Sequence, residues 1–336
     1  MSPTTTTLQA HDRAAHTMTV KVSLIIPSYN RGSLIAETID SALAQTEPFH
    51  EIIVVDDGST DNTVEVLARY AGAIQLIKRS RAGVQAARNA GAAKASGNFI
   101  ALCDSDDLLE PGFLKCAADW FRAHPDHDAF YSNFVTFNDT GVQLDKFAGA
   151  PTGYFDGARR EGDYLHDIPG LYGRTVQYQP LFISGAIVSR ALFDRIGGFD
   201  TRFNDIGGED WEFTLRAISA GKVAVTALPL VKIRKHDSNQ SKDSVRSERG
   251  TAHILEHALE HHSGAAEHRD QIRTSIEARR LRAFHGAFET AKFPVAEEML
   301  IKLRQRPTDL RFRLKVLILG MPEPLRRWLW RLTQAR

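Results

Sequence analysis

Four short apolar runs near the start of the chain, separated by segments of helical periodicity, constrain the fold more than any other feature. The runs have the length of strands and are rich in Ile, Val and Leu, as strands buried on both faces are, and they cover 22–27, 51–57, 74–79 and 99–104. Between them, apolar residues recur at helical spacing over 34–43 and 64–71, and 82–95 is rich in Ala. This alternation predicts an α/β fold, with a mostly parallel sheet between two layers of helices and a ligand site beyond the carboxyl ends of the strands.

The rest of the chain is predicted to complete this domain and then to become helical. Pro111 is predicted to begin a helix, and further strands or helices are expected over 128–137, 182–189, 209–220 and 222–233, the last as a strand pair broken at Pro229. Residues 139–180 have no clear period and predict a long loop or insertion, such as a lid. The expected organisation is a flexible segment over 1–20, an α/β domain over 21–241 and a helical region over 242–336.

Charge and cysteine content exclude several classes of protein. The formal net charge is +1, from 42 basic and 41 acidic side chains, so no global field attracts nucleic acid. Cys103 and Cys116 are too few for a disulfide framework, which favours a reducing compartment. Neither a secretory signal nor an apolar run long enough to span a membrane is visible, so we expect a cytoplasmic protein.

The final segment, 311–336, carries seven Arg or Lys residues against Glu323 alone, interleaved with Leu and Trp. A basic, Trp-bearing amphipathic helix is typical of a protein that lies on an anionic bilayer, here the inner face of the membrane. The alternative is a helix packed on the core or on a second copy of the chain in a homodimer. The sequence leaves both open.

Histidines gather at the start of the helical region. They are His253, His257, His261, His262 and His268. Because no acidic or Cys ligand set accompanies them, we predict a solvated helix face without a metal.

Polar residues follow the first two predicted strands. The sequence over 26–31 is Ile-Pro-Ser-Tyr-Asn-Arg, and the absence of a G-x-G-x-x-G turn argues against NAD or FAD. Its aromatic and polar residues can contact a base and a ribose. After the second strand, Asp57 can accept hydrogen bonds from a base or ribose, and Asp61 is predicted to cap the next helix.

The most specific signal closes the fourth strand, where Asp104, Ser105, Asp106 and Asp107 follow one another. Three carboxylates within four residues repel one another unless a cation or strong donors offset their charge. Mg²⁺ or Mn²⁺ prefers such oxygen ligands and shares them with substrate phosphates. The sequence therefore predicts a divalent-metal site at this edge of the sheet.

In this order, the motifs resemble those of glycosyltransferase family 2 enzymes, which have the GT-A fold. The resemblance runs over about 22–241 and also includes Arg88-Asn89, Gly197-Gly198-Phe199-Asp200 and Glu209-Asp210-Trp211. It implies a metal held by Asp106, Asp104 and His236, and a catalytic base, Asp210. It implies donor contacts from Pro27, Tyr29, Asn30, Arg31, Asp57, Arg88, Asn89, Asp104, Ser105 and Asp107. Acceptor contacts are implied for Ser184, Gly185, Glu209 and Trp211.

The implied activity is an inverting, metal-dependent transfer of a sugar from a nucleotide-diphosphate donor, by default a UDP-sugar. The acceptor is a hydroxyl of a glycan or a lipid-linked molecule, in cell-surface polysaccharide synthesis. Asp210 would take the acceptor proton, and an ordinary Asp, ionised near neutral pH, needs no large pKa shift to do so. A Q-x-x-R-W motif is absent from the sequence, which favours single addition over processive synthesis.

Two alternatives compete with this interpretation. A nucleotidyltransferase also joins an α/β sheet to metal-binding acids, but it needs a Gly-rich, basic loop after the first strand, and 27–32 is not one. A non-catalytic nucleotide-sugar-binding protein would be expected to lose its acids, whereas Asp104, Asp106 and Asp210 are all present.

Overall fold

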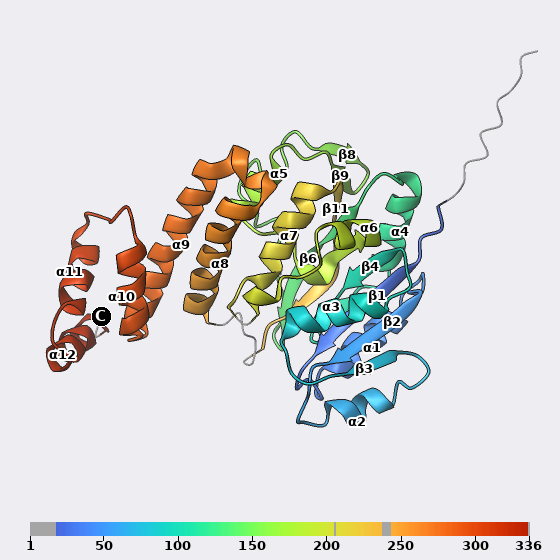
Figure 1. Ribbon diagram of the computed structural model, residues 1–336, viewed down its shortest axis with the longest axis horizontal. Helices are drawn as coiled ribbons and strands as arrows, with labels where there is room; N and C mark the ends of the chain where they lie inside the picture. The colour runs from blue at the N-terminus through green and yellow to red at the C-terminus, as the bar shows by residue number, and fades with distance from the viewer. Residues whose placement is uncertain (1–17, 205, 237–242, 335–336) are drawn as a thin grey trace, which may run out of the picture.

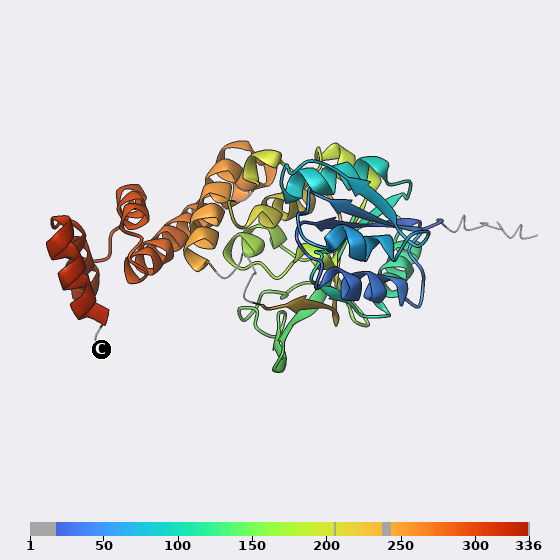
Figure 2. The same cartoon turned by 90° about the horizontal axis from the view of Figure 1, so that it is seen from below.

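The computed structural model describes residues 18–204, 206–236 and 243–334, so most of the flexible segment expected over 1–20 lies outside the described residues. An 11-stranded sheet forms the centre, in the order β3-β2-β1-β4-β10-β6-β11-β9-β8, with β5 and β7 paired off this path. Helices cover both faces of its first half, and further helices extend from one end (Figures 1 and 2). The α/β architecture predicted from the alternation is therefore present.

The first half of the sheet consists of the four predicted strands. They are parallel neighbours: β1 (Val22–Ser28), β2 (Glu51–Asp56), β3 (Gln75–Lys78) and β4 (Phe99–Leu102). Their crossovers contain α1 (Ile35–Leu43), α2 (Thr63–Ala68) and α3 (Val84–Lys94). Leu24 and Ile26 join the cluster that contains α1 and α2 residues, whereas Ile25 lies in a cluster with Ala92 of α3. Successive side chains of β1 are thus buried on opposite faces, as a two-sided sheet requires.

Two strand predictions need correction. β3 is an edge strand whose four residues are exposed or half-buried, because no strand pairs with its outer side in the described residues. The strand pair expected over 222–233 is one continuous strand, β11 (Val223–Arg234), which stays parallel to β6 (Ala129–Asn138) through a bulge around Pro229. A bulge accommodates Pro without ending the strand, since the pairing is interrupted only locally.

The second half of the sheet is mixed. β10 (Ala186–Ser189) runs antiparallel between β4 and β6, and the first part of the strand expected over 182–189 is a 3₁₀ turn, Ile183–Gly185. The predicted loop over 139–180 is more ordered than expected. It contains β7 (Gly141–Asp145), β8 (Arg159–Glu161), β9 (Tyr164–His166) and α5 (Leu171–Gln177). Its apolar residues pack on the core, with Leu165 and Ile168 buried.

The remaining elements of the sheet domain connect its strands. β5 (Leu108–Leu109) pairs with β11 directly after the acidic motif. The helix predicted from Pro111 is α4 (Phe113–Ala123), and α6 (Arg190–Arg195) and the 3₁₀ turn Thr201–Phe203 lead to α7 (Glu209–Ala220).

The C-terminal part is helical, as expected. It comprises α8 (Ser244–His261), a 3₁₀ segment (Ser263–His268), α9 (Arg269–Glu289), α10 (Phe293–Lys302), α11 (Leu310–Leu319) and α12 (Glu323–Gln334). α8 packs on α7, and α11 and α12 lie at the end of the molecule farthest from the sheet (Figures 1 and 2). In the described ranges no helix combines the length and apolarity that crossing a bilayer needs.

Candidate active site

A cavity of about 540 Å³ lies where β1, β2 and β4 end and α7 begins. Parallel strands bring their carboxyl ends to one edge, so motifs far apart in the sequence meet there. Most residues singled out from the sequence line this cavity: Pro27, Tyr29, Asn30, Arg31, Asp57, Arg88, Asp104, Ser105, Asp106, Asp107, Glu209, Asp210 and Trp211.

Four predicted site residues are not among those that line the cavity: Asn89, Ser184, Gly185 and His236, of which His236 contacts Asp106. The amide of Asn89 donates to the carbonyl of Phe199 at 2.8 Å and accepts from its N–H at 2.8 Å, so it fastens α3 to the loop after α6 instead of facing the cavity. Ser184 and Gly185 lie behind the acidic motif. A Cβ on Gly185 would stand 3.1 Å from the carbonyl oxygen of Ser132, so this glycine permits close backbone packing.

The first two carboxylates of the motif, Asp104 and Asp106, have basic partners within the protein. Asp104 Oδ1 accepts from Arg88 Nη2 at 2.6 Å. Asp106 Oδ2 lies 3.0 Å from His236 Nε2 and 3.4 Å from Arg31 Nε. The repulsion inferred from the sequence is therefore offset in part by the protein itself, and not by a metal alone.

Asp107, in contrast, is buried beneath the motif. Its carboxylate accepts from Ser184 Oγ at 2.6 Å and from the main-chain N–H of Arg234 at 3.0 Å. Burial, followed by the charges of Asp106 and Asp104, raises the pKa of Asp107 well above its usual range. Asp107 thus joins the loop after β4 to β11 at the cavity wall, and its carboxylate is already engaged within the protein, whereas the resemblance implied a donor contact.

Asp104 and Asp106 fit a divalent cation. Each keeps one carboxylate oxygen that accepts no hydrogen bond from the described residues, and their side chains are 26% and 12% exposed at the cavity wall. Hard oxygen ligands of this kind suit Mg²⁺ or Mn²⁺, which complete their coordination with water and phosphate oxygens. These two carboxylates therefore fit the coordination chemistry of a magnesium or manganese ion.

Asp210 lies across the cavity in the first turn of α7. Its side chain is 22% exposed, and Oδ1 accepts from Arg88 Nη1, so one guanidinium joins Asp210 to Asp104. Burial raises the pKa of Asp210 to about 7; Arg88 lowers it, while Asp104 and Glu209 raise it further. The expectation of an unshifted Asp is wrong, because desolvation outweighs the single cation.

The side of the cavity at the end of β2 is built around Asp57. Its carboxylate accepts from the N–H groups of Ala82 and Gly83, the latter at 2.7 Å, and lies 3.2 Å from Arg79 Nε. These bonds order the loop before α3, which presents Arg81 with its guanidinium 3.8 Å from the centroid of the Tyr29 ring. Asp57 therefore orders the loop that carries Arg81 as well as lining the cavity.

Sequence reasoning missed or understated several lining residues. Arg81 and Lys235 are exposed cations that make no ion pair in the described part of the chain. Arg81 follows the third strand, so the rule that places sites at strand ends would have found it. Gln179 and Ser247 also line the cavity, but they lie outside strand-end motifs and left no signal.

The loop that leads into α7, just before Asp210, rests on α8, a helix outside the predicted α/β domain. Gly207 and Gly208 have φ values of 87° and 82°, which favour glycine. A Cβ at Gly250 of α8 would stand 2.2 Å from the carbonyl oxygens of Ile206 and Gly207. The helical region thus supports the candidate base and contributes Ser247 to the cavity wall.

The histidines are not all solvated, contrary to the prediction. His262 is buried, with Nε2 3.3 Å from Glu212 Oε1 of α7 and Nδ1 3.2 Å from the hydroxyl of Tyr172. The ligand atoms of Glu212, His257 and His262 lie within 4.8 Å of one another. Both Glu212 oxygens also accept from Arg216, at 2.6 and 2.5 Å. Polar contacts therefore join Glu212 to Arg216 and to His262, which also contacts Tyr172, and they fix α7 against the end of α8; Glu212 is an acid that sequence spacing did not reveal.

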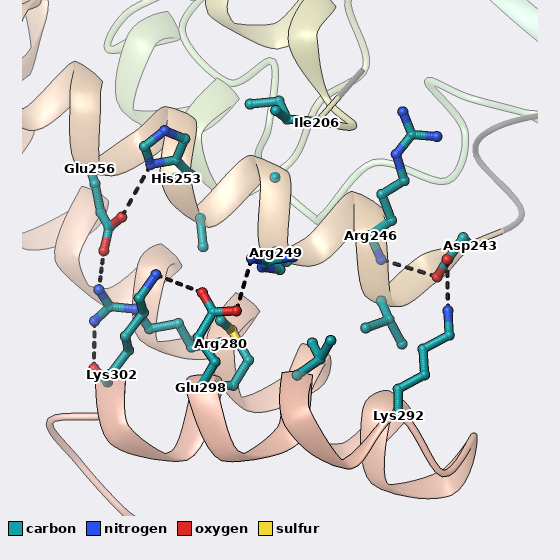
Figure 3. Close-up of a pocket in the computed structure, with 15 residues that line it drawn as sticks. Ile206, Asp243, Arg246, Arg249, His253, Glu256, Arg280, Lys292, Glu298 and Lys302 are labelled. Atoms are coloured by element: carbon teal, nitrogen blue, oxygen red, sulfur yellow. Dashed lines mark hydrogen bonds and ion pairs between the residues drawn. The ribbon is translucent and has the colours of Figure 1, made fainter. Parts of the chain in front are cut away.

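A second cavity of about 560 Å³ lies between α8 and α10 (Figure 3). Its walls carry ion pairs, among them Arg249 with Glu298 at 2.9 Å and Lys292 with Asp243 at 2.7 Å. These cations are neutralised by acids beside them, whereas Arg81 and Lys235 in the first cavity are not. We therefore take the cavity at the strand ends as the candidate active site.

Comparison with known proteins gives consistent matches. Residues 23–170 match the family described as Glycosyl transferase family 2, and residues 172–239 match the N-terminal domain of galactosyltransferase. The uncharacterized glycosyltransferase YwdF of Bacillus subtilis is 34% identical over 204 residues, which cover 59% of this chain and 68% of that protein. TuaG of Bacillus subtilis, a glycosyltransferase named for teichuronic acid biosynthesis, is 34% identical over 134 residues, covering 39% of this chain and 53% of that protein.

Solved structures agree in fold. TarS of S. aureus in complex with UDP-GlcNAc superposes with a TM-score of 0.59 at 20% identity, covering 91% of this chain and 82% of that one. The mannosyltransferase PcManGT from Pyrobaculum calidifontis, in complex with GDP-Man and Mn²⁺, gives a TM-score of 0.56 at 21% identity, covering 93% and 84%. The GT-A fold expected from the sequence is confirmed.

Proposed function

Since this chain belongs to glycosyltransferase family 2, we propose that it transfers a sugar from a nucleoside-diphosphate donor to a hydroxyl group with inversion at the anomeric carbon. One observation carries the proposal: Asp104, Asp106 and Asp210 line the same cavity as an aromatic ring and cations without acidic partners. Binding a nucleobase and a charged diphosphate, and stabilising the leaving group as it forms, requires this combination of acids, aromatic ring and cations.

The donor would lie along the ends of β1, β2 and β4. Tyr29 and Pro27 would contact the base, and Asp57 would meet the base or ribose beside the loop that it orders. Arg81 and Lys235 would meet the diphosphate, because both are cations without an ion pair in the described structure. UDP is the default nucleotide. Its support is the UDP-GlcNAc that TarS binds in its solved complex.

Asp104 and Asp106, with His236 beside Asp106, would hold Mg²⁺ or Mn²⁺. When bound, the metal supplies positive charge that stabilises the diphosphate leaving group. PcManGT, whose solved complex contains Mn²⁺ with GDP-Man, supports this assignment.

Asp210 would act as the general base. Its carboxylate would take the proton of the acceptor hydroxyl as that oxygen attacks the anomeric carbon, and the bond to the diphosphate would break on the opposite side. Arg88 would keep this carboxylate aimed into the cavity through its bond to Oδ1. Glu209 and Trp211 would border the acceptor, since both line the cavity beside Asp210.

We further propose a glycan or lipid-linked acceptor in cell-surface polysaccharide synthesis, with one sugar added per encounter. TuaG, named for teichuronic acid biosynthesis, supports this context. Residues 21–241 would carry the chemistry, and the helical region from 242 onward would support the Asp210 loop through Gly250. The nucleotidyltransferase alternative is disfavoured by the loop after β1, which is not Gly-rich, and the non-catalytic alternative by the retained acids.

The test is release of nucleoside diphosphate from a panel of UDP-, GDP- and dTDP-sugars, measured with Mg²⁺, with Mn²⁺ and with a chelator. We expect metal-dependent release from at least one donor, and loss of that dependence in Asp106→Ala. The matched control is Asp270→Ala. Asp270 is 96% exposed and does not line the cavity, so this variant should behave as the parent protein. Release that is equal with metal and with chelator would refute the metal assignment, and no release from any donor would refute the transfer proposal.

A further inference from the structure

Exposed apolar side chains concentrate at the C-terminal end of the molecule. In the described residues, ten large hydrophobic side chains are exposed, and seven of them lie between 301 and 332. They are Ile301, Leu310, Leu314, Leu317, Leu325, Trp328 and Leu332. Scattered exposed leucines need no explanation, but such a concentration marks an interaction surface.

On α11 and α12 these side chains form stripes. Leu310, Leu314 and Leu317 follow the i, i+4, i+7 spacing of one face of α11, and the opposite side packs inward through Phe312 and Leu319. α11 is therefore docked on the protein by one face and leaves a second apolar face uncovered.

α12 repeats this arrangement. Leu325, Trp328 and Leu332 share one face, whereas Trp330 donates from its indole N–H to the carbonyl of Phe288 at 2.7 Å. Trp328 is 57% exposed, so the two tryptophans of this helix have opposite roles: one anchors the helix and the other faces outward.

Unpaired cations flank both stripes. Arg311, Arg313 and Arg331 are exposed and make no ion pair with any residue that the structure describes. At about 100° per residue, Arg311 and Arg313 fall on either side of the α11 stripe and Arg331 falls beside the α12 stripe. Over 303–334 the acids are Asp309 and Glu323, against eight cations: Arg304, Arg306, Arg311, Arg313, Lys315, Arg326, Arg327 and Arg331.

We propose that α11 and α12 lie on the surface of a bilayer that contains anionic lipids. The leucines and Trp328 would enter the boundary between headgroups and acyl chains, and the three unpaired arginines would meet lipid phosphates. These two helices lie at the end of the molecule farthest from the sheet (Figures 1 and 2), and their apolar stripes are exposed among the residues that the structure describes.

Charge decides between this surface and a second copy of the chain. A two-fold interface sets the same patch against itself, and over 303–334 this patch carries eight cations against two acids, so a second copy would bring a surplus of positive charge together. An anionic bilayer offers the opposite charge. The inference rests on the surface of these helices and not on the chemistry of the cavity.

The experiment is co-sedimentation of the full chain with vesicles of phosphatidylcholine alone or mixed with phosphatidylglycerol. We expect binding to the mixed vesicles only, weakened by added salt. The triple variant Arg311→Glu, Arg313→Glu, Arg331→Glu should bind at least about 100-fold more weakly, since each basic residue near an anionic surface contributes about fivefold. Trp328→Ser combined with Leu314→Ser should also lose binding.

The matched control reverses three exposed cations of the sheet domain, Arg69→Glu, Lys78→Glu and Lys94→Glu, and should bind as the parent does. Equal loss in the control, or no binding by the parent, overturns the proposal. A dimer in analytical ultracentrifugation that Trp328→Ser dissociates, without vesicle binding, would assign the surface to a second copy instead. Nucleoside-diphosphate release, measured in parallel, shows whether each variant keeps its active site and separates this outcome from failure of the transfer proposal.

Discussion

At the scale of single residues, Arg88 determines how the charges of the candidate site are arranged. It is a buried cation that donates to Asp104 at 2.6 Å and also to Asp210. A buried charge needs partners, and here the two partners belong to the proposed metal site and to the proposed base. Burial of Asp210 beside this cation explains why the pKa of Asp210 stays raised, since desolvation outweighs the charge of Arg88.

The pKa of Asp210 predicts the pH dependence of transfer. A general base works only when it is ionised, and burial raises the pKa of Asp210 to about 7. The transfer rate should therefore fall about tenfold per pH unit below that value and level off above it. The measurement is kcat/KM between pH 5 and 9, with the best donor from the release panel.

Two variants sharpen this prediction. Asp210→Asn should lose transfer and keep donor binding. Glu209→Gln should move the inflection to lower pH, because the Glu209 charge raises the pKa of Asp210. An Asp210→Asn variant that transfers at the parent rate, or a flat profile in the parent protein, would contradict the base assignment.

At the scale of elements, contact between α7 and α8 decides where Asp210 lies. The loop before α7 packs on α8 so closely that Gly250 has no room for a side chain. The buried network of Glu212, Arg216 and His262 fixes the other end of the same contact. The helical region is thus part of the site's support, although its sequence lies outside the resemblance to family 2.

Gly250→Ala tests this support. In an open helix this change stabilises by about 0.5–1 kcal/mol. Here the new Cβ would meet two carbonyl oxygens at 2.2 Å, so we expect a net loss of roughly 1–3 kcal/mol and a lower kcat with little change in donor affinity. Thermal unfolding and steady-state kinetics measure both effects.

The matched control is Gly112→Ala, at a glycine with φ of −89° and no atom within 4 Å of its added Cβ. Gly250→Ala protein that is as stable and as active as this control would show that the loop tolerates displacement.

At the scale of the whole molecule, the cavity draws on both halves of the sheet domain and on α8, so a bound donor should stabilise the chain as one unit. A ligand at 100 times its Kd adds about 2.7 kcal/mol to stability. We therefore expect UDP with Mn²⁺ to raise Tm by a few degrees, more than GDP or dTDP does. Asp106→Ala should reduce the increase that depends on metal, and an unchanged Tm with every nucleotide would contradict donor binding at this site.

The sequence by itself determined the strand and helix order, the parallel first half of the sheet and the edge at which the acids gather. These follow from local periodicity and from the rule that parallel strands end together, so Asp57, Asp104 and Tyr29 could be assigned to one cavity without coordinates. The final helices were also predicted as basic and amphipathic, although their uncovered faces appeared only in three dimensions.

Only the tertiary structure decided which groups are partners. Arg88 and Asp210 are 122 residues apart, and Glu212 and His262 belong to different elements, so no local pattern pairs them. The same holds for the pKa of Asp210, the burial of Asp107 and the turning of Asn89 toward Phe199. Hydrogen bonds and desolvation act over a few ångströms, and the chain brings those neighbours together only when it folds.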